Sequence, residues 1–375
     1  MRKLKVQNHI RKYLFAGGGT GGHLFPALAI ADELKKLDTN AEFLFVGTKN
    51  KIEARIVPQR GYRFETIWIS GFQRSLQLQN LLFPFKVIIS LLQSFNIINQ
   101  YKPSIVIGTG GYVSGPILLA ASIAGIKTIL HESNSYPGAV TRFLSKRMTK
   151  VFITFDATKK WLKLSNNIEM TGNPTRNELG TISKSDGVKY FGLFDSRKTL
   201  LVFGGSLGAA SINTALMNMI KTILNSNIQI IWQTGESDFE RVKSKLNELE
   251  INSSDGIWIG KFIDKMEYAY ASADVVLSRA GATTLAEITR LGKAVILIPY
   301  PHAVADHQTI NARTLEEAGA ALMIQDSELM NEAEKLILSL MNNDHLRAEM
   351  NKKCLGLGKP DAGKIIASKI IKMVN

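Results

Sequence analysis

The distribution of apolar residues in the first half of the chain is typical of an alternating α/β protein. Apolar residues recur at near-helical spacing in the segments between short apolar runs, as at Leu28, Ala31 and Leu34. The runs that we interpret as strands are Tyr13–Ala16, Ala41–Val46, Ser104–Ile107, Thr128–Leu130 and Val151–Phe155. Strands alternating with helices predict a parallel sheet with helices on both faces.

The same pattern restarts after residues 171–176, where Pro174 ends any regular element. The strands expected in this half are Thr199–Phe203, Ile228–Gln233, Ile257–Gly260, Asp274–Ser278 and Ala294–Pro299. We therefore expect two Rossmann-like domains, residues 1–173 and 174–358, with the ligand site in the cleft between them. The 375-residue length suits two domains, and residues 359–375 read as a final helix.

Composition narrows the class of protein. The chain is 45% hydrophobic and 21% charged, which is ordinary for a soluble globular protein. Its single cysteine, Cys354, cannot form a disulfide within the chain, so nothing indicates an oxidising compartment. The first apolar run is too short for the core of a signal peptide.

The net charge of +14 suggests anionic partners, but the basic residues are scattered along the chain. This disfavours nucleic acid and leaves anionic lipid or anionic substrates. The most apolar segment, Leu81–Ile98, contains Pro84 and Lys86, so a membrane span is not expected. It is either a buried helix or a patch in the lipid interface, with Arg74 and Lys86 on anionic headgroups.

A glycine-rich turn, residues 17–22, ends the first expected strand and leads into a helix with Pro26 in its first turn. Glycines let backbone N–H groups approach a phosphate closely. The turn satisfies G-x-G-x-x-G, but the second strand ends in Gly47-Thr48-Lys49 without the acid of a dinucleotide site. No P-loop lysine follows either. We expect a phosphate cradle of another kind, and the alternative is a tight turn without a ligand.

His23 at the mouth of this turn is a candidate general base, because its ordinary pKa lies near neutrality. The alternative is a structural histidine. A second polar group, His131-Glu132-Ser133-Asn134, follows a strand end, where ligands bind in α/β sheets. No His/Cys pair has metal-ligand spacing and no Asp-x-Asp motif is present, so we expect a site without metal.

The second half carries its own glycine turn, residues 204–208, and a further helix start at residues 279–287. The N–H groups of that helix start can hold a diphosphate. Glu287 one turn later is either a partner for a ribose diol or an ordinary solvated carboxylate. Gln308, at the polar start of another helix, is a candidate to read a sugar or a base.

Six motifs occur in the order found in one enzyme family. They are Gly18-Gly19-Thr20-Gly21-Gly22-His23, Gly110-Gly111-Tyr112-Val113-Ser114-Gly115-Pro116, His131-Glu132-Ser133-Asn134, Gly172-Asn173-Pro174-Thr175-Arg176, Gly204-Gly205-Ser206-Leu207-Gly208-Ala209 and Gly281-Ala282-Thr283-Thr284-Leu285-Ala286-Glu287. Over essentially its whole length the chain resembles the MurG family, peripheral membrane glycosyltransferases of peptidoglycan synthesis. It departs from the family at Ser133, where Gln is frequent, and at Thr283, where Leu is frequent.

The resemblance implies a GT-B fold, in which the parallel sheets of two Rossmann-like domains face each other across a cleft. It implies transfer of N-acetylglucosamine from its UDP donor to undecaprenyl-diphosphate-N-acetylmuramoyl-pentapeptide, converting lipid I into lipid II with inversion. No cofactor and no metal are expected. The implied location is the cytoplasmic face of the cell membrane, on anionic lipids, among proteins of cell-wall synthesis and division, and the final helix is expected to return to the first domain.

The resemblance also assigns residues, beginning with His23 as the general base. The donor-binding residues it implies are Thr20, Gly21, Gly22, Asn134, Arg176, Ser206, Ile263, Ala282, Thr283, Thr284, Leu285, Ala286, Glu287 and Gln308. Those for the acceptor diphosphate are Gly18, Gly19, Gly110, Gly111 and Tyr112, and Leu81–Leu92 falls in the membrane-docking region.

Three other functions compete with this interpretation. The nearest is another GT-B transferase with a diacylglycerol or macrolide acceptor, although two glycine loops in the first half favour an acceptor that carries a diphosphate. A non-catalytic sugar-nucleotide or scaffold protein is disfavoured by the presence of His23, Glu287 and Gln308. A dinucleotide oxidoreductase is disfavoured by the missing acid after the second strand.

Overall fold

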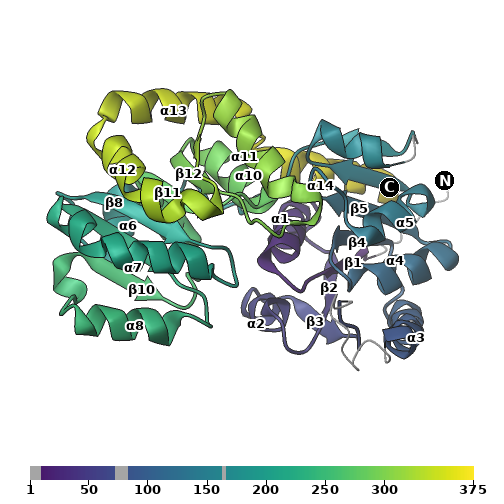
Figure 1. Cartoon of the computed structure of the whole chain (residues 1–375). Coiled ribbons are helices and arrows are strands. Elements are labelled where there is room, and N and C mark those ends of the chain that lie inside the picture. Colours follow the sequence, from purple (N-terminus) through teal and green to yellow (C-terminus); the bar gives the residue numbers. More distant parts are fainter. Residues whose placement is uncertain (1–9, 72–82, 163–165) are drawn as a thin grey trace. The chain divides into compact units, whose positions relative to one another are not determined.

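The chain forms two compact units, each built on one parallel sheet. The computed structural model describes residues 10–71, 83–162 and 166–375. The first unit contains the chain up to Pro174 together with Asp361–Asn375, and the second contains Thr175–Pro360 (Figure 1). The predicted fold class, two α/β units with parallel sheets, is confirmed.

The sheet of the first unit has parallel pairing between all neighbouring strands. In spatial order its strands are β3 (Arg63–Thr66), β2 (Glu42–Gly47), β1 (Lys12–Gly17), β4 (Ile105–Gly110), β5 (Lys127–Glu132), β6 (Lys150–Ile153) and β7 (Ile168–Met170). On the central strand, Phe15 is aligned with Phe45 on one side and with Ile107 on the other. These central strands are almost wholly apolar because helices cover both of their faces.

The helices of this unit follow the strands as α/β alternation requires. They are α1 (Gly21–Leu37), α2 (Ile52–Gln59), α3 (Phe83–Tyr101), α4 (Ser114–Ile123), α5 (Ala139–Leu144), the 3-10 turns Ser145–Arg147 and Asp156–Trp161, and α14 (Ala362–Val374). Because α1 begins at Gly21, Pro26 lies in its second turn and not in its first. Helix α14 packs on α1, so the end of the chain completes the first unit (Figure 1).

The second unit repeats the strand order of the first without a seventh strand. Its strands lie in the order β10 (Ile257–Gly260), β9 (Ile228–Gln233), β8 (Lys198–Phe203), β11 (Val275–Arg279), β12 (Ala294–Ile298) and β13 (Leu322–Met323). In both units the third, second, first, fourth, fifth and sixth strands are neighbours. The order reverses between β1 and β4 and between β8 and β11, which is where doubly wound sheets bind ligands.

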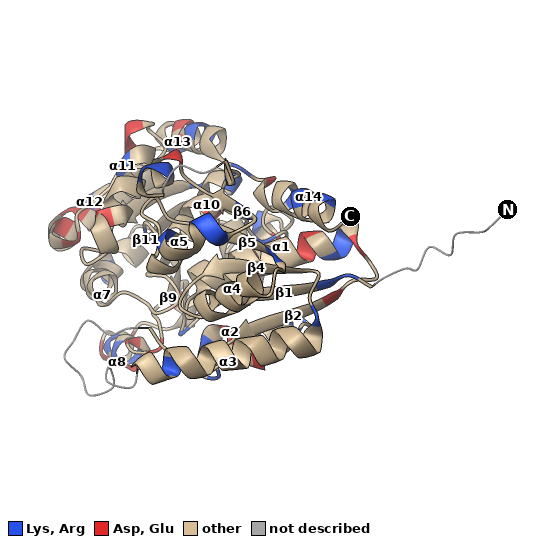
Figure 2. Cartoon of the chain, turned by 90° about the vertical axis from the view of Figure 1, so that its right-hand side faces the viewer, with Lys and Arg blue, Asp and Glu red and all other residues tan. Residues whose placement is uncertain are grey.

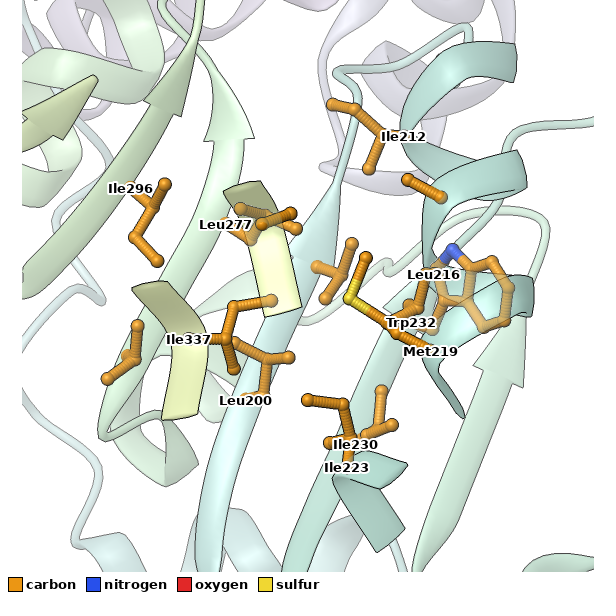
Figure 3. Packing of buried hydrophobic residues seen from close by; sticks show 14 of the residues in the cluster. Leu200, Ile212, Leu216, Met219, Ile223, Ile230, Trp232, Leu277, Ile296 and Ile337 are labelled. Atoms are coloured by element: carbon orange, nitrogen blue, oxygen red, sulfur yellow. The ribbon is translucent and has the colours of Figure 1, made fainter. Parts of the chain in front are cut away.

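Helices cover both faces of this second sheet as well. They are α6 (Lys184–Tyr190), α7 (Ala210–Asn225), α8 (Phe239–Glu248), α9 (Met266–Ser272), α10 (Ala282–Leu291), α11 (His307–Glu317), α12 (Leu329–Asn342) and α13 (Asp344–Leu357), with 3-10 turns at Ser253–Asp255, Val304–Asp306 and Asp326–Glu328. Figure 3 shows Trp232 of β9 packed with Leu216 and Met219 of α7. The indole Nε1 donates to Oδ1 of Asn213 at 2.9 Å, which satisfies the polar atom of a fully buried ring.

Helix α3 presents an apolar face to solvent. Ser90, Ser94 and Ile97 are on its buried side, whereas Phe85 is 63% and Leu92 is 64% exposed. The alternative of a wholly buried helix is therefore wrong for this segment. Figure 2 shows few charged residues along the visible side of α3. No helix within the described ranges is long and apolar enough to cross a bilayer.

Part of the predicted docking region lies outside the described residues. Arg74, Leu81 and Leu82 lie outside the described residues. The described part of the region begins with α3 at Phe83.

Candidate active site

Two glycine loops of the first unit meet around His23. The first follows β1 and the second follows β4, so both lie where the strand order reverses. Gly110 and Gly111 have φ values of +102° and +77°, which favour glycine. A Cβ atom on Gly110 would lie 2.6 Å from Nδ1 of His23, and one on Gly111 would lie 2.5 Å from the carbonyl oxygen of Gly18. Side chains at these positions would therefore displace the imidazole and separate the loops.

The hydrogen bonds of His23 define its tautomer. Nδ1 lies 3.1 Å from the carbonyl oxygen of Thr109, and a carbonyl oxygen can only accept. Nδ1 therefore carries the hydrogen, and in the neutral ring Nε2 has the free lone pair. The Thr109 hydroxyl in turn donates to the His23 carbonyl oxygen at 2.7 Å. The ring is held in the form that a general base requires.

The surroundings of His23 lower its pKa. Burial is the largest cause, because it disfavours the charged imidazolium. The negative charge of Glu132, the Thr109 carbonyl and the negative charge of Glu53 act in the opposite direction, in decreasing order. The result is a ring that is neutral near pH 7, with two carboxylates nearby to stabilise the proton it takes up.

Glu132 orients Asn134, which was predicted to bind the donor. Its buried carboxylate accepts from the backbone N–H of Asn134 at 3.0 Å and from Nδ2 of the same residue at 3.2 Å. The other oxygen accepts from the N–H of Gly138 at 3.0 Å and from the hydroxyl of Thr141 at 2.6 Å. Glu132 therefore fixes the orientation of the Asn134 amide.

His131 precedes Glu132 and has a structural position; both residues lie within β5 and do not follow the strand end as predicted. Its side chain is fully buried, and Nε2 lies 3.1 Å from the carbonyl oxygen of Gly172. Burial lowers its pKa to about 4. The ring is therefore neutral over the physiological range and links β5 to the segment that follows β7.

The first glycine loop contacts Glu53 of α2, a residue not predicted from the sequence. Its carboxylate accepts from the N–H of Gly19 at 2.9 Å, and from the N–H and hydroxyl of Thr48 at 3.1 and 2.9 Å. The ring of Tyr112 packs against the other side of Gly19. A glutamate in the first turn of a helix is usually read as a partner of the helix dipole, so nothing in the sequence distinguished this one.

Two groups of predicted donor residues in the second unit, Ser206 and residues 282–287, lie where its strand order reverses. The loop after β8 contains Ser206, which is partly exposed, and α10 begins at Ala282 directly after the loop that follows β11. Ala282 and Leu285 are buried against the core, whereas Thr283 and Thr284 are partly exposed. The first turn of α10 can therefore present backbone N–H groups and threonine hydroxyls to a bound anion.

Glu287 on α10 is buried and ion-paired, so the alternative of a solvated carboxylate is wrong. Oε1 lies 3.1 Å from Nε of Arg176, and Oε2 accepts from the hydroxyl of Tyr270 at 3.1 Å. Burial raises the pKa of Glu287, and the charge of Arg176 opposes that rise. In addition, Arg290 donates to the hydroxyl of Thr175 at 2.8 Å, so α10 is tied to residues 175 and 176 at two points.

Gln233, at the end of β9, connects two further parts of this site. Its Oε1 accepts from the backbone N–H of Ile263 at 2.8 Å, and its Nε2 donates to the carbonyl oxygen of Gly205 at 2.8 Å. Gln308 lies at the start of α11, where its Oε1 accepts from the backbone N–H of Tyr300 at 3.0 Å. The predicted contacts of Ile263 with uracil and of Gln308 with the sugar stay predictions.

The residues that sequence reasoning missed fall into two groups. Thr109 and Gln233 are polar residues near the C-terminal ends of buried apolar strands. Glu132 has the same kind of position and belongs to a predicted motif, but its role in orienting Asn134 was not predicted. That position is a usable signal, because a polar group there is buried at the ligand-binding edge of the sheet. Glu53 and Tyr270 are on helices, and only their tertiary contacts reveal them.

Known proteins resemble the chain over both units. Residues 13–153 match the model of the glycosyltransferase family 28 N-terminal domain, and residues 199–366 match that of the C-terminal domain. Among solved structures, MurG of Acinetobacter baumannii superposes with a TM-score of 0.69 at 28% identity, covering 97% of this chain and all of that one. A Streptomyces glycosyltransferase at 13% identity has a TM-score of 0.58, covers 96% of this chain and 99% of its own, and shows the fold alone.

Curated relatives are similar over nearly their full length. A Flavobacterium psychrophilum protein is 41% identical over 97% of this chain and 98% of its own, and a Chlorobaculum parvum protein is 44% identical over 96% and 99%. Both carry the name UDP-N-acetylglucosamine–N-acetylmuramyl-(pentapeptide) pyrophosphoryl-undecaprenol N-acetylglucosamine transferase. The chain therefore belongs to this transferase family, the MurG family within glycosyltransferase family 28.

Proposed function

We propose that this chain transfers N-acetylglucosamine from UDP-N-acetylglucosamine to the 4-hydroxyl of the N-acetylmuramoyl group of lipid I, which makes lipid II for peptidoglycan synthesis. The observation that carries the proposal is the near full-length identity of 41–44% to relatives named for this transfer. The geometry of His23 supports it, because the acceptor hydroxyl must lose a proton as it attacks the sugar.

In this proposal the donor binds mainly to the second unit. The first turn of α10 and Ser206 hold the diphosphate, Glu287 accepts from the ribose, Ile263 meets uracil and Gln308 meets the sugar. Arg176, Asn134 and residues 20–22 complete the donor site. Negative charge grows on the diphosphate as UDP leaves, and a helix N-terminus stabilises such charge without a metal. The partial exposure of the threonines on α10 supports this assignment.

The acceptor binds to the first unit in this proposal. The two glycine loops and Tyr112 take its diphosphate, and His23 removes the proton from its 4-hydroxyl. Direct attack on the anomeric carbon from the face opposite UDP inverts the configuration. The Nε2 lone pair, set by the hydrogen bond from Nδ1 to Thr109, supports the role of His23.

We also place the protein peripherally on the cytoplasmic face of the cell membrane, with α3 in the lipid interface. Five apolar side chains on α3 are exposed: Phe85, Val87, Ile88, Ile89 and Leu92. Next to them, Lys86 donates to the hydroxyl of Ser70 at 3.1 Å and lies over the ring of Trp68, itself 48% exposed. An apolar face with a nearby cation and tryptophan suits an anionic lipid surface.

Vesicle binding tests that placement. Replacing both Ile88 and Leu92 by Ser should weaken binding to phosphatidylglycerol vesicles about tenfold or more, because two exposed apolar side chains no longer enter the interface. Met330→Ser on α12, which replaces an apolar residue of the second unit that is also more than half exposed, is the control. Equal retention of the double variant and the control would contradict docking through α3.

The transfer itself is tested by UDP release. The protein is incubated with UDP-N-acetylglucosamine in a metal chelator, with and without a lipid I analogue. We expect release that depends on the acceptor and persists in chelator. Tight UDP binding without release would leave the donor site intact and contradict the proposed acceptor, whereas release that requires added metal would contradict the metal-independent mechanism.

A further inference from the structure

The carboxylate of Glu53 fills a pocket enclosed by glycines. Its side chain is 1% exposed, and a Cβ atom on Gly18 would lie 2.5 Å from its carboxyl carbon. The hydrogen bond from the Gly19 N–H, at 2.9 Å, occupies one carboxylate oxygen, and the two bonds from Thr48 occupy the other. The glycine loop therefore already binds an anion, which belongs to the protein.

We propose that Glu53 is a positioning residue for the transfer reaction: its carboxylate, and not a substrate phosphate, is the permanent partner of the Gly19 N–H and fixes the first glycine loop. This inference rests on the proposed function, and it removes the Gly19 N–H from the donors available to the acceptor diphosphate. The diphosphate then depends on the other groups of the two loops and on Tyr112.

Electrostatics favours a carboxylate that stays in place. One N–H hydrogen cannot serve two anions well, and a phosphate beside a buried carboxylate would meet a like charge at short range. Moving Glu53 away would leave the buried N–H and hydroxyl of Thr48 without this acceptor. Displacement by substrate would therefore cost the protein several buried hydrogen bonds at once.

The contacts of Glu53 extend to the other groups of the site. The ring of Tyr112 packs on Gly19, so the carboxylate that holds Gly19 indirectly supports the tyrosine. Gly19 also precedes Thr20, whose carbonyl oxygen accepts from the N–H of His23 at 3.2 Å. The position of the imidazole therefore depends on a loop that Glu53 holds.

Glu53→Gln separates charge from shape. The amide has a single oxygen, so its NH₂ group must face either the Gly19 N–H or the two donors of Thr48. We expect the kcat for transfer to a lipid I analogue to fall about tenfold or more, since a hydrogen bond to a charged group is lost within the loop. The KM for UDP-N-acetylglucosamine should change less than kcat, because only residues 20–22 of its proposed site belong to this loop and the rest lie mainly in the second unit.

The pH profile supplies a readout that loss of packing would not give. The negatively charged groups that face His23 are Glu132 and Glu53. His131 also faces it and carries a positive charge when it is protonated. Removing the negative charge of Glu53 makes protonated His23 less stable. The acidic limb of the kcat/KM profile should therefore move to lower pH in Glu53→Gln and stay in place in the control, Glu42→Gln, which removes a partly exposed carboxylate paired with Lys12 at 3.6 Å.

Each result decides a separate claim. An active wild type with an unaffected Glu53→Gln variant would overturn this inference alone, whereas a wild type that does not turn over lipid I would overturn the proposed function. A KM for the lipid I analogue that falls tenfold in Glu53→Gln would also overturn the inference about Glu53, because the carboxylate would then have been occupying a phosphate site. If that variant does not fold, Thr48→Val, which removes one donor to Glu53, should lower kcat in the same direction, and an unchanged kcat would overturn the inference.

Discussion

The two units have the same strand order but different chemistry where that order reverses. In the first unit, two glycine loops enclose the imidazole of His23, with the buried carboxylates of Glu53 and Glu132 nearby. In the second, a glycine turn and the start of α10 lie beside a buried pair of Arg176 and Glu287. The first arrangement is suited to moving a proton and the second to holding an anion. The shared topology determines where ligands bind, and the side chains determine what happens to them.

The largest expected effect comes from removing His23, the proposed proton acceptor of the first unit. His23→Ala should cut turnover about 10²-fold or more, because it removes the proposed general base, while UDP affinity stays near normal. Steady-state rates with a lipid I analogue and calorimetric titration with UDP measure the two quantities. Unchanged turnover would remove His23 from the mechanism and with it the contrast between the units.

Acidification should distinguish the units by stability. Burial lowers the pKa of His131 to about 4 from its ordinary value of 6.5, so the unfolded chain binds a proton at pH values where the folded unit does not. The free energy of unfolding therefore does not depend on His131 above about pH 6.5. As the pH falls from 6.5 toward 4, it decreases by about 3 kcal/mol because the unfolded chain takes up the proton. Urea unfolding at pH 7 and pH 4.5, followed by hydrogen exchange in each unit, should show the loss in the first.

Two histidine variants test that assignment. His131→Gln retains a donor toward the Gly172 carbonyl and should reduce the acid sensitivity. His345→Gln, which alters a histidine of the second unit whose side chain is 85% exposed, should leave it unchanged. Equal sensitivity in wild type and His131→Gln would show that other groups control the acid response.

A smaller change is expected from neutralising the carboxylate of the second unit. Glu287→Gln should weaken UDP binding about tenfold, since the proposed charged acceptor for the ribose is replaced by a neutral amide. Titration with UDP and with 2′-deoxy-UDP should show that the variant discriminates less than the wild type between the two nucleotides. The control is Glu317→Gln, at an exposed position on α11. A variant that keeps both the affinity and the preference would make Glu287 only the structural partner of Arg176.

The smallest effect should come from the hydroxyl that supports Glu287. Tyr270→Phe removes the donor to Oε2 but leaves Arg176 in place, so we expect UDP binding to weaken about threefold to fivefold. Calorimetric titration with UDP compares the affinity of this variant with that of Tyr268→Phe, which changes a nearby tyrosine of α9 that has no assigned role. Identical affinities would show that Arg176 alone suffices to orient the carboxylate.

Much of the fold follows from the pattern of apolar residues, because the inner strands are buried on both faces. Ile228–Gln233 and Ile257–Gly260 are found with the predicted bounds, and most other predicted strands differ at their ends by one to three residues. The strands that we missed, β3, β7 and β13, lie at the sheet edges. They are short and mostly half-buried, so no continuous apolar run marks them.

The site was less predictable than the fold, for a physical reason. The glycine turns and His23 are visible because glycine and histidine have distinctive properties. The hydrogen bonds that orient these groups join residues far apart in the chain, as Gly19 with Glu53 and His23 with Thr109. Only the fold brings such pairs together, so no local spacing could have indicated them.

The helix that closes the first unit has a consequence for how the protein is made. In sequence the second unit is an insertion, since α14 follows it and packs on α1. A ribosome therefore exposes α1 (Gly21–Leu37) long before α14 (Ala362–Val374) emerges, and at usual rates of synthesis that delay is roughly 15 to 65 seconds. During this interval the apolar face of α1 stays uncovered, because α14, with its buried residues Ile366 and Ile370, has not yet been synthesised. The second unit, complete in one stretch, is free to fold first.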